Sequence, residues 1–412
     1  MKKTLAAVAV LGAFAGSALA ADVQLYGIVD TGVGYNHVDV DSLDGINIPN
    51  KAGGATAYSF ADSDSFSMMS GQASGSRWGL KGTEDLGNGL TVGFILEDGF
   101  TSDNGADSAP MFNRESSLFV QGGFGKFAMG RMGSLNNGQS SWAKVGMVSA
   151  FGTSDWGGYS AQLSNIFSLA GQWDNMVAYE TPSFAGFKVY AQYAMGSNDN
   201  ENESSSDRYY AIGATYNNGP FAGYFAVDSI NYQTSGAKID DKYIDDSLTV
   251  TLGGSWNFEV AKVYFGAQYF DEVKLSSIGG ITKTTVSDVN LSKIGDLPDI
   301  TVGALVKVKG YGISLTADAP VAGGKAMFGV GYVDAEAADS IQDALKDANA
   351  DADLDLKRYV VSVGYDYPFS KRTDVYAIAS YMQDQVDTKL SGTSYDWDPS
   401  AYTLYVGLRH RF

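Results

Sequence analysis

Hydrophobic and polar residues alternate with a period of two along much of this chain. In residues 187–194 the apolar set is Phe187, Val189, Ala191 and Tyr193, with polar or amphipathic residues between them. The same alternation recurs in four further stretches, at 247–258, 261–270, 358–367 and 401–412. A period of two predicts β-strands that carry one apolar face and one polar face.

The connections between the predicted strands alternate strictly in length. Short ones are expected at 82–89, 121–125, 181–186, 217–220, 257–260, 319–324 and 367–373. Long ones are expected at 36–73, 100–113, 133–172, 195–207, 231–246, 271–310, 335–356 and 384–400. This order joins 16 strands, with short turns at one end and long loops at the other.

A soluble β-sandwich also has alternating strands, but nothing in that fold sorts the connections by length. Outer-membrane barrels do sort them, with short periplasmic turns and long extracellular loops. The sequence therefore predicts an all-β, 16-stranded antiparallel transmembrane β-barrel, with lipid outside and water inside.

The last strand, residues 401–412, supports closure of the barrel. Its apolar set ends in Leu408, His410 and Phe412, whereas Arg409 and Arg411 lie on the opposite face. A free terminal strand would leave an unpaired edge, and unpaired backbone groups in hydrocarbon cost several kcal/mol each. We expect this strand to pair antiparallel with the first strand, residues 23–35.

The first 20 residues have the features of a secretory signal peptide. Two lysines precede an apolar stretch from Leu5 to Phe14, and Ala18-Leu19-Ala20 offers a cleavage site. Gly12 and Gly16 interrupt the stretch, which is short for a membrane anchor. We expect cleavage after Ala20, export, and a barrel over residues 21–412.

Composition narrows the class further. Fifty glycines and 13% aromatic residues suit many strands and tight turns, and the lack of cysteine excludes a disulfide scaffold. A net charge of −19 argues against a nucleic-acid partner. The two histidines, His37 and His410, fall at a loop margin and on the predicted lipid face. Neither position suits a hydrolase, so we do not expect an enzyme.

Six segments resemble the general porins of Gram-negative bacteria, particularly the proteobacterial type. They are LYGIVDTGV at 25–33, GSRWGLKGTEDLGNGL at 75–90, FNRES at 112–116, FGKFAMGR at 124–131, YETPSFAGF at 179–187 and the terminal VGLRHRF. The resemblance implies a homotrimer in the outer membrane, with the third long loop, residues 133–172, folded into each lumen as a constriction. It also implies that Phe412 belongs to a signal read by the barrel-assembly machinery.

In similar porins, basic side chains on the wall face acidic ones on the third loop. Arg77 and Arg114 occupy positions where the family carries wall arginines. The alternation of side chains along a strand places Lys81 on the same face as Arg77. The alternation supports an inward Arg114 less well, because Glu115 and Ser117 would then face outward. The alternative for Arg114 is a solvated arginine at the rim. Glu97 should point inward, either lining the pore or bonding structurally to the wall arginines.

The third loop departs from the family pattern. It offers Asp155 with Lys144 opposing it, in place of a compact acidic motif, and Gln172 and Trp173 stand where many relatives carry a third wall arginine. The resemblance therefore implies a weaker transverse field than usual. Trp142, Phe151 and Trp156 could narrow the bore, although packing of the loop against the wall is the favoured interpretation.

Arg131 shares a face with Phe127 and Met129, so parity turns it outward. A charge facing lipid at mid-depth costs about 2–4 kcal/mol. We therefore predict that Arg131 lies at a subunit interface and pairs with a neighbouring chain.

No cofactor is expected. Residues 347–355, DANADADLD, superficially resemble a calcium loop but lack the mid-loop glycine and the closing glutamate. An acidic, solvated loop with a short helix over 340–347 is the favoured interpretation. Loosely bound divalent cations between the acidic loops and lipopolysaccharide remain a hypothesis.

The function that follows is a water-filled outer-membrane channel for passive diffusion of small hydrophilic solutes and ions. A substrate-selective channel would need a row of aromatic residues down the bore, but Tyr190, Tyr224 and Tyr264 lie on different strands. A barrel that serves as an adhesin or a structural protein would need no open lumen. Both alternatives stay open at this point.

Overall fold

The computed structural model describes residues 22–40, 46–49, 55–58, 62–108, 110–196, 207–232, 245–275, 307–347, 353–390 and 393–412. The predicted signal peptide and most of the acidic loop residues lie outside this set. Within the described residues, no helix has the length and hydropathy needed to cross a membrane.

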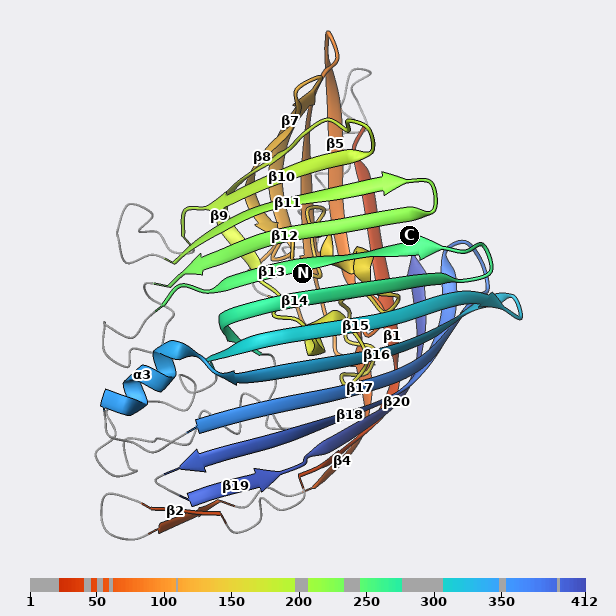
Figure 1. Ribbon diagram of the computed structural model, residues 1–412. Helices are drawn as coiled ribbons and strands as arrows, with labels where there is room; N and C mark the ends of the chain where they lie inside the picture. Colours follow the sequence, from red (N-terminus) through yellow and green to blue (C-terminus); the bar gives the residue numbers. More distant parts are fainter. Residues whose placement is uncertain are drawn as a thin grey trace.

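All but two of the described strands form one closed antiparallel sheet, the predicted 16-stranded barrel (Figure 1). The first half of the wall comprises β1 (Gln24–Asp39), β4 (Ser63–Ser70), β5 (Arg77–Gly87), β6 (Leu90–Gly99), β7 (Glu115–Gly122), β8 (Gly125–Gly133), β9 (Gln172–Glu180), β10 (Phe187–Ala194) and β11 (Arg208–Asn218). The second half comprises β12 (Phe221–Asn231), β13 (Leu248–Asn257), β14 (Lys262–Lys274), β15 (Lys307–Val321), β16 (Gly324–Ala337), β17 (Asp353–Pro368), β18 (Thr373–Leu390), β19 (Thr393–Trp397) and β20 (Ser400–Arg411).

Two wall strands are each built from two pieces. β4 and β5 both pair with β1, and β19 and β20 both pair with β18. The 18 strand segments of the sheet therefore form 16 barrel strands, each of which we call a stave. A separate hairpin joins β2 (Ile46–Pro49) to β3 (Ala55–Tyr58). The short helix expected over 340–347 is confirmed as α3 (Asp339–Asp347), and in Figure 1 it lies at the end of the barrel opposite the tight turns.

The terminal strand closes the barrel as predicted. β20 pairs antiparallel with β1 from Ile28 opposite Arg411 to Asp39 opposite Ser400. The last residue extends this pairing, because Gly27 and Phe412 exchange backbone hydrogen bonds of 3.1 and 3.0 Å. Closure leaves the backbone of the last strand paired on both sides, as a hydrocarbon environment requires.

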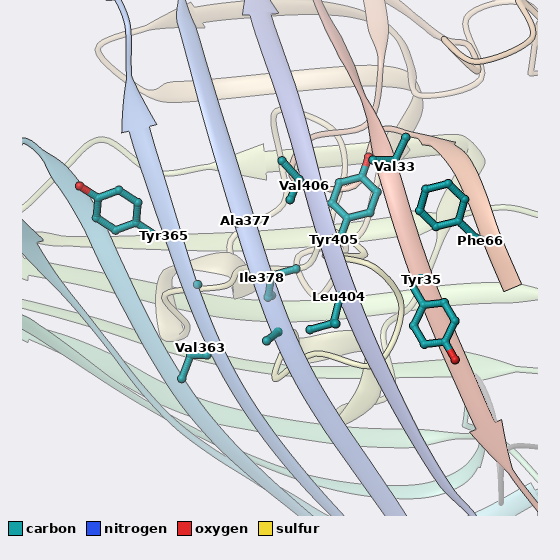
Figure 2. A pocket seen from close by; sticks show the side chains of 12 residues that line it. Val33, Tyr35, Phe66, Val363, Tyr365, Ala377, Ile378, Leu404, Tyr405 and Val406 are labelled. Atoms are coloured by element: carbon teal, nitrogen blue, oxygen red, sulfur yellow. The ribbon is translucent and has the colours of Figure 1, made fainter. Parts of the chain in front are cut away.

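The outer face of the barrel is apolar. Figure 2 shows side chains from β17, β18, β20, β1 and β4, among them Val363, Leu404, Val406, Val33 and Phe66, around a groove of about 570 Å³. Phe265 and Val363 are 46% and 51% exposed, so neither is packed between two sheets. This exposure excludes the β-sandwich alternative.

Two parts of the predicted strand map are wrong. Most of the connection expected over 384–400 is strand, because β18 extends to Leu390 and β19 covers Thr393–Trp397. A continuous loop was expected over 36–73, but β1 extends to Asp39 and the second stave starts at Ser63. That stave is then interrupted at residues 71–76, between the pairing of β4 with residues 31–38 of β1 and the pairing of β5 with residues 24–28. The alternation signal is lost here because glycine and serine occupy most of residues 70–76.

Candidate functional site

The connection between β8 and β9, residues 134–171, folds inside the barrel, where Figure 1 shows it in yellow among the wall strands. It contains two short 3-10 helices, η1 (Val145–Val148) and η2 (Leu163–Asn165). We call this segment the inner loop. Glycines of the wall let it approach closely: a Cβ at Gly312 would lie 2.0 Å from the Ile166 carbonyl oxygen, and one at Gly331 would lie 2.3 Å from the Ile166 side chain.

Polar side chains of the wall bind the backbone of the inner loop. Leu135 N–H donates to Gln192 on β10 (2.9 Å), Ala150 N–H to Thr316 on β15 (2.8 Å) and Ser168 N–H to Gln268 on β14 (2.7 Å). Farther round, Ala161 N–H donates to Ser362 on β17 (2.7 Å). Each such buried bond contributes about 1 kcal/mol net. The loop is therefore fixed to the wall over much of its length.

Two buried side-chain clusters add to this anchoring. Asn136 donates to the Asp228 carboxylate and accepts a 2.7 Å bond from the Tyr224 hydroxyl. Arg358 forms a two-point ion pair with Asp384 (2.7 and 2.8 Å) and donates to the Asn165 carbonyl (3.1 Å).

The aromatic residues of the inner loop pack against the wall. Trp142, Phe151 and Trp156 are all buried, and Trp156 meets Phe151 and Tyr376 edge to face. The favoured interpretation of these three residues as packing groups is confirmed.

A polar cavity of about 610 Å³ remains between the inner loop and the wall formed by β5, β6 and β7. Three basic and three acidic side chains are among its described lining residues: Arg77, Lys81, Arg114, Glu97, Glu115 and Asp155. Five of these six were predicted from the sequence as pore residues. Lys144, the sixth predicted residue, lies outside this lining set.

Glu97 joins the two wall arginines. Its carboxylate accepts a hydrogen bond from Arg114 Nε (2.7 Å) and another from the Tyr26 hydroxyl (3.0 Å). It also lies 3.4 Å from Arg77 Nε. Arg114 also donates to the Gln139 side chain at 2.8 Å. Glu97 thus borders the cavity and bonds structurally to the arginines, and its pore-lining role stays a prediction.

Lys81 and Asp155 are the most exposed charges around the cavity. Lys81 extends from β5 with its ammonium 5.0 Å from the centre of the Tyr26 ring. Asp155 projects from the inner loop next to Ser154 and Thr153, which also line the cavity. The arrangement places a basic wall and a loop carboxylate around one water-accessible space.

Glu115 is a lining residue that the sequence did not identify. Its buried carboxylate accepts bonds from the Ser140 hydroxyl (3.0 Å), the Ser141 N–H (2.7 Å) and the Ser117 hydroxyl (2.8 Å). The expectation that Glu115 faces outward if Arg114 faces inward is wrong, because Arg114 precedes β7 and does not follow its alternation. The exposure of Leu118 on the outer face fixes the parity of β7.

Lys144 lies elsewhere on the inner loop, over the Tyr190 ring at 5.4 Å, and donates to the Ser141 carbonyl at 2.9 Å. Its partly desolvated position lowers the pKa of Lys144 to about 8. It does not oppose Asp155 across the cavity.

Arg131 has partners within its own chain. Arg131 Nη1 donates to Asp174 at 2.5 Å and its Nε donates to the Asn113 carbonyl at 2.7 Å. A register shift between Gly130 and Met132 interrupts the alternation on which the outward assignment was based. A neighbouring subunit is therefore not needed to balance this charge, and the interface role stays a prediction.

A closed barrel with an apolar outer face and a polar lumen narrowed by an inner loop defines an outer-membrane channel. A family model described as Gram-negative porin matches residues 6–387. The chain belongs to this family. It is an outer-membrane porin through which solutes diffuse, and it is not an enzyme.

Individual relatives agree with this assignment. An outer membrane porin protein of Bordetella pertussis is 32% identical over 432 residues, with 100% of both chains covered. Outer membrane porin protein 32 of Delftia acidovorans is 28% identical, also over the full length of both. Among solved structures, an anion-selective porin from Comamonas acidovorans aligns with a TM-score of 0.63 and 24% identity, covering 95% of this chain and 100% of that one.

Proposed function

We propose that the cavity between the inner loop and β5–β7 is the constriction of a general diffusion channel with weak charge selectivity. The observation that carries this proposal is the balanced lining, with Arg77, Lys81 and Arg114 against Glu97, Glu115 and Asp155. Passive diffusion needs a water-filled bore and a narrow point whose charges sort solutes.

The charges of the lining are not equally available to a passing ion. Glu97 is occupied by the two arginines, and Glu115 is occupied by serine hydroxyls and a backbone N–H. Lys81 and Asp155 therefore contribute most to the sorting of ions. Because their signs are opposite, the channel has only a small net preference.

A substrate-selective channel is less well supported. Tyr190 and Tyr224 face inward but are 3% and 2% exposed, and Tyr224 is bonded to the inner loop through Asn136. They cannot form a row of aromatic faces for a passing sugar.

Reversal potentials in a planar bilayer under a KCl gradient test the proposal. We expect the unaltered channel to give a value far below that of an ideally selective pore. Lys81→Ala should shift the preference toward cations and Asp155→Asn toward anions, because each removes one exposed charge. Lys346→Ala, which alters an exposed lysine on α3, is the matched control.

Folded Lys81→Ala and Asp155→Asn channels with unchanged reversal potentials would show that the constriction lies elsewhere. Saturation of the current by a single sugar or amino acid would favour the substrate-selective alternative. Absence of conductance steps from the unaltered protein would favour an adhesin.

The assembly expected of this channel is a homotrimer, inserted by the barrel-assembly machinery and surrounded by lipid and lipopolysaccharide. The Phe412 ring is 46% exposed on the outer face, which is compatible with recognition of the terminal residue during insertion. Arg131 at the subunit interface and loosely bound divalent cations at the acidic loops remain part of this proposal. Loss of trimer heat resistance in Arg131→Ala or after chelation would support them.

A further inference from the structure

The break in the second stave, residues 71–76 (GQASGS), lies beside the cavity and contacts both of its sides. Gly71, Ser74 and Gly75 are among the lining residues. Gly71 has φ +70°, and a Cβ there would lie 3.0 Å from Gly75 Cα, so the segment turns too tightly for another residue at position 71. We call residues 71–76 the inward bulge.

The backbone of Asp30 on β1 closes the gap that the inward bulge leaves in the sheet. Its carbonyl accepts bonds from Gly71 N–H (2.9 Å) and the Ser76 hydroxyl (3.0 Å), and its N–H donates to Ser76 Oγ (3.1 Å). Both ends of the bulge are therefore hydrogen-bonded to β1, as expected of a regular irregularity in a sheet.

The Asp30 side chain holds the centre of the bulge. Its carboxylate is fully buried. One carboxylate oxygen accepts hydrogen bonds from Ala73 N–H (3.1 Å) and Ser74 N–H (2.8 Å), and the other accepts one from the Tyr376 hydroxyl (2.5 Å). Arg409 on β20 donates to the Ser74 hydroxyl at 2.7 Å. Ala73 N–H also donates to the Tyr376 hydroxyl on β18 at 3.2 Å, so the bulge is bonded to three strands where the barrel closes.

On the side of the inner loop, the contact is made by Gln72. Its carbonyl accepts Trp156 N–H and its side-chain Oε1 accepts Gly157 N–H, both at 2.8 Å. These loop residues directly follow Asp155. The Gln72 side chain is 5% exposed, and its amide nitrogen donates to the Ser70 carbonyl at 3.0 Å.

On the side of the basic wall, the contacts are made by the end of the bulge. Arg77 Nη1 donates to the Gly75 carbonyl at 3.0 Å. A Cβ at Gly75 would lie 3.0 Å from Arg114 Nη1, so the bulge backbone packs directly against that guanidinium.

We propose that the inward bulge is a second constriction element, and that Gln72 is a positioning residue that fixes the distance between Asp155 and the basic wall. The inference rests on the proposed function of the cavity. The inner loop alone does not set the pore width, because Trp156 and Gly157, which follow Asp155, are bonded to Gln72 of the inward bulge.

The test uses the full-length protein, which has no native cysteine. Asp155→Cys first establishes whether the cavity conducts: modification by an anionic methanethiosulfonate should reduce single-channel conductance. Gln72→Met, which keeps the side-chain shape but removes its hydrogen bonds, is then added. We expect about a fivefold higher modification rate and larger open-channel current fluctuations, as the loss of one hydrogen bond predicts for the displaced loop.

One further variant makes the outcome specific. Gln385→Met, at an exposed glutamine on β18, is the matched control and should leave both readouts unchanged.

The results separate the two proposals. If modification of Asp155→Cys leaves conductance unchanged, the proposed constriction is wrong. If modification blocks the channel but Gln72→Met changes neither modification rate nor current fluctuation, the constriction stands and the role of the bulge is overturned. If Gln72→Met does not fold, Ser74→Ala, which removes only the contact with Arg409, should give a smaller effect of the same sign; no effect would likewise overturn it.

Discussion

At the scale of single residues, Glu97 balances the basic side chains around the cavity. One carboxylate bonds Arg114 at 2.7 Å, lies 3.4 Å from Arg77, and accepts the Tyr26 hydroxyl. The guanidinium groups of Arg77 and Arg114 can lie close together on the wall only because the Glu97 carboxylate lies between them. The same contact neutralises much of the negative charge that Glu97 brings to the cavity.

Glu97→Gln should therefore change two properties together. The free energy of unfolding should fall by about 3–5 kcal/mol, because the variant leaves buried guanidinium charge without its partner. The reversal potential should move toward anion preference. Glu259→Gln, at the exposed turn between β13 and β14, is the control, and a Glu97→Gln channel with unaltered selectivity and stability would contradict this role.

Residue patterns predicted the wall better than the constriction. The alternation of Arg77, Gly79 and Lys81 with Trp78 and Leu80 placed two cavity residues correctly on the inner side of β5. Alternation fails where strands are irregular: Arg114 precedes β7, and Arg131 follows Gly130 in a register shift. In both places the charged partner lies on another strand, Glu97 on β6 and Asp174 on β9, which no local pattern reports.

At the scale of elements, the inner loop behaves as part of the wall. Asn136 is fully buried and joins the loop to Asp228 and Tyr224 on β12. Gln192, Gln268, Thr316 and Ser362 bind further loop N–H groups. Some of the polar side chains that point into the barrel are thus hydrogen-bonded to the inner loop and do not face water.

Asn136→Ala should weaken this attachment. It removes the donor to the buried Asp228 carboxylate and the acceptor of the Tyr224 hydroxyl, at a cost of about 1–3 kcal/mol. Urea unfolding of the refolded barrel should show that loss, together with noisier open-channel currents. Asn218→Ala, at an exposed position near a tight turn, should show neither change. Equal stability and noise in the two variants would refute the anchoring role.

Element boundaries were largely readable from the sequence. β10 has the bounds predicted for residues 187–194, and the pairing of the terminal strand with β1 was expected from the cost of a free edge. The inward bulge was not predicted. Its glycines and serines resemble an ordinary loop, and the residues that shape it, Asp30, Tyr376 and Arg409, are far away in sequence.

At the scale of the whole molecule, one physical arrangement explains both fold and function. Apolar side chains such as Leu252, 57% exposed, cover the outside, whereas charged side chains such as Lys81 border the inner cavity. This is the inverse of a soluble globular protein, and it is stable only where hydrocarbon surrounds the outer face. The channel follows from the same sorting of residues.

Cysteine labelling in intact membranes tests this arrangement most directly, since the chain has no cysteine of its own. We predict that a probe on Leu252→Cys is quenched by spin-labelled lipid tails and resists a water-soluble thiol reagent. Lys81→Cys should react rapidly with that reagent and show no lipid quenching. The opposite pattern, or equal labelling of both positions in a detergent-free soluble protein, would contradict the account.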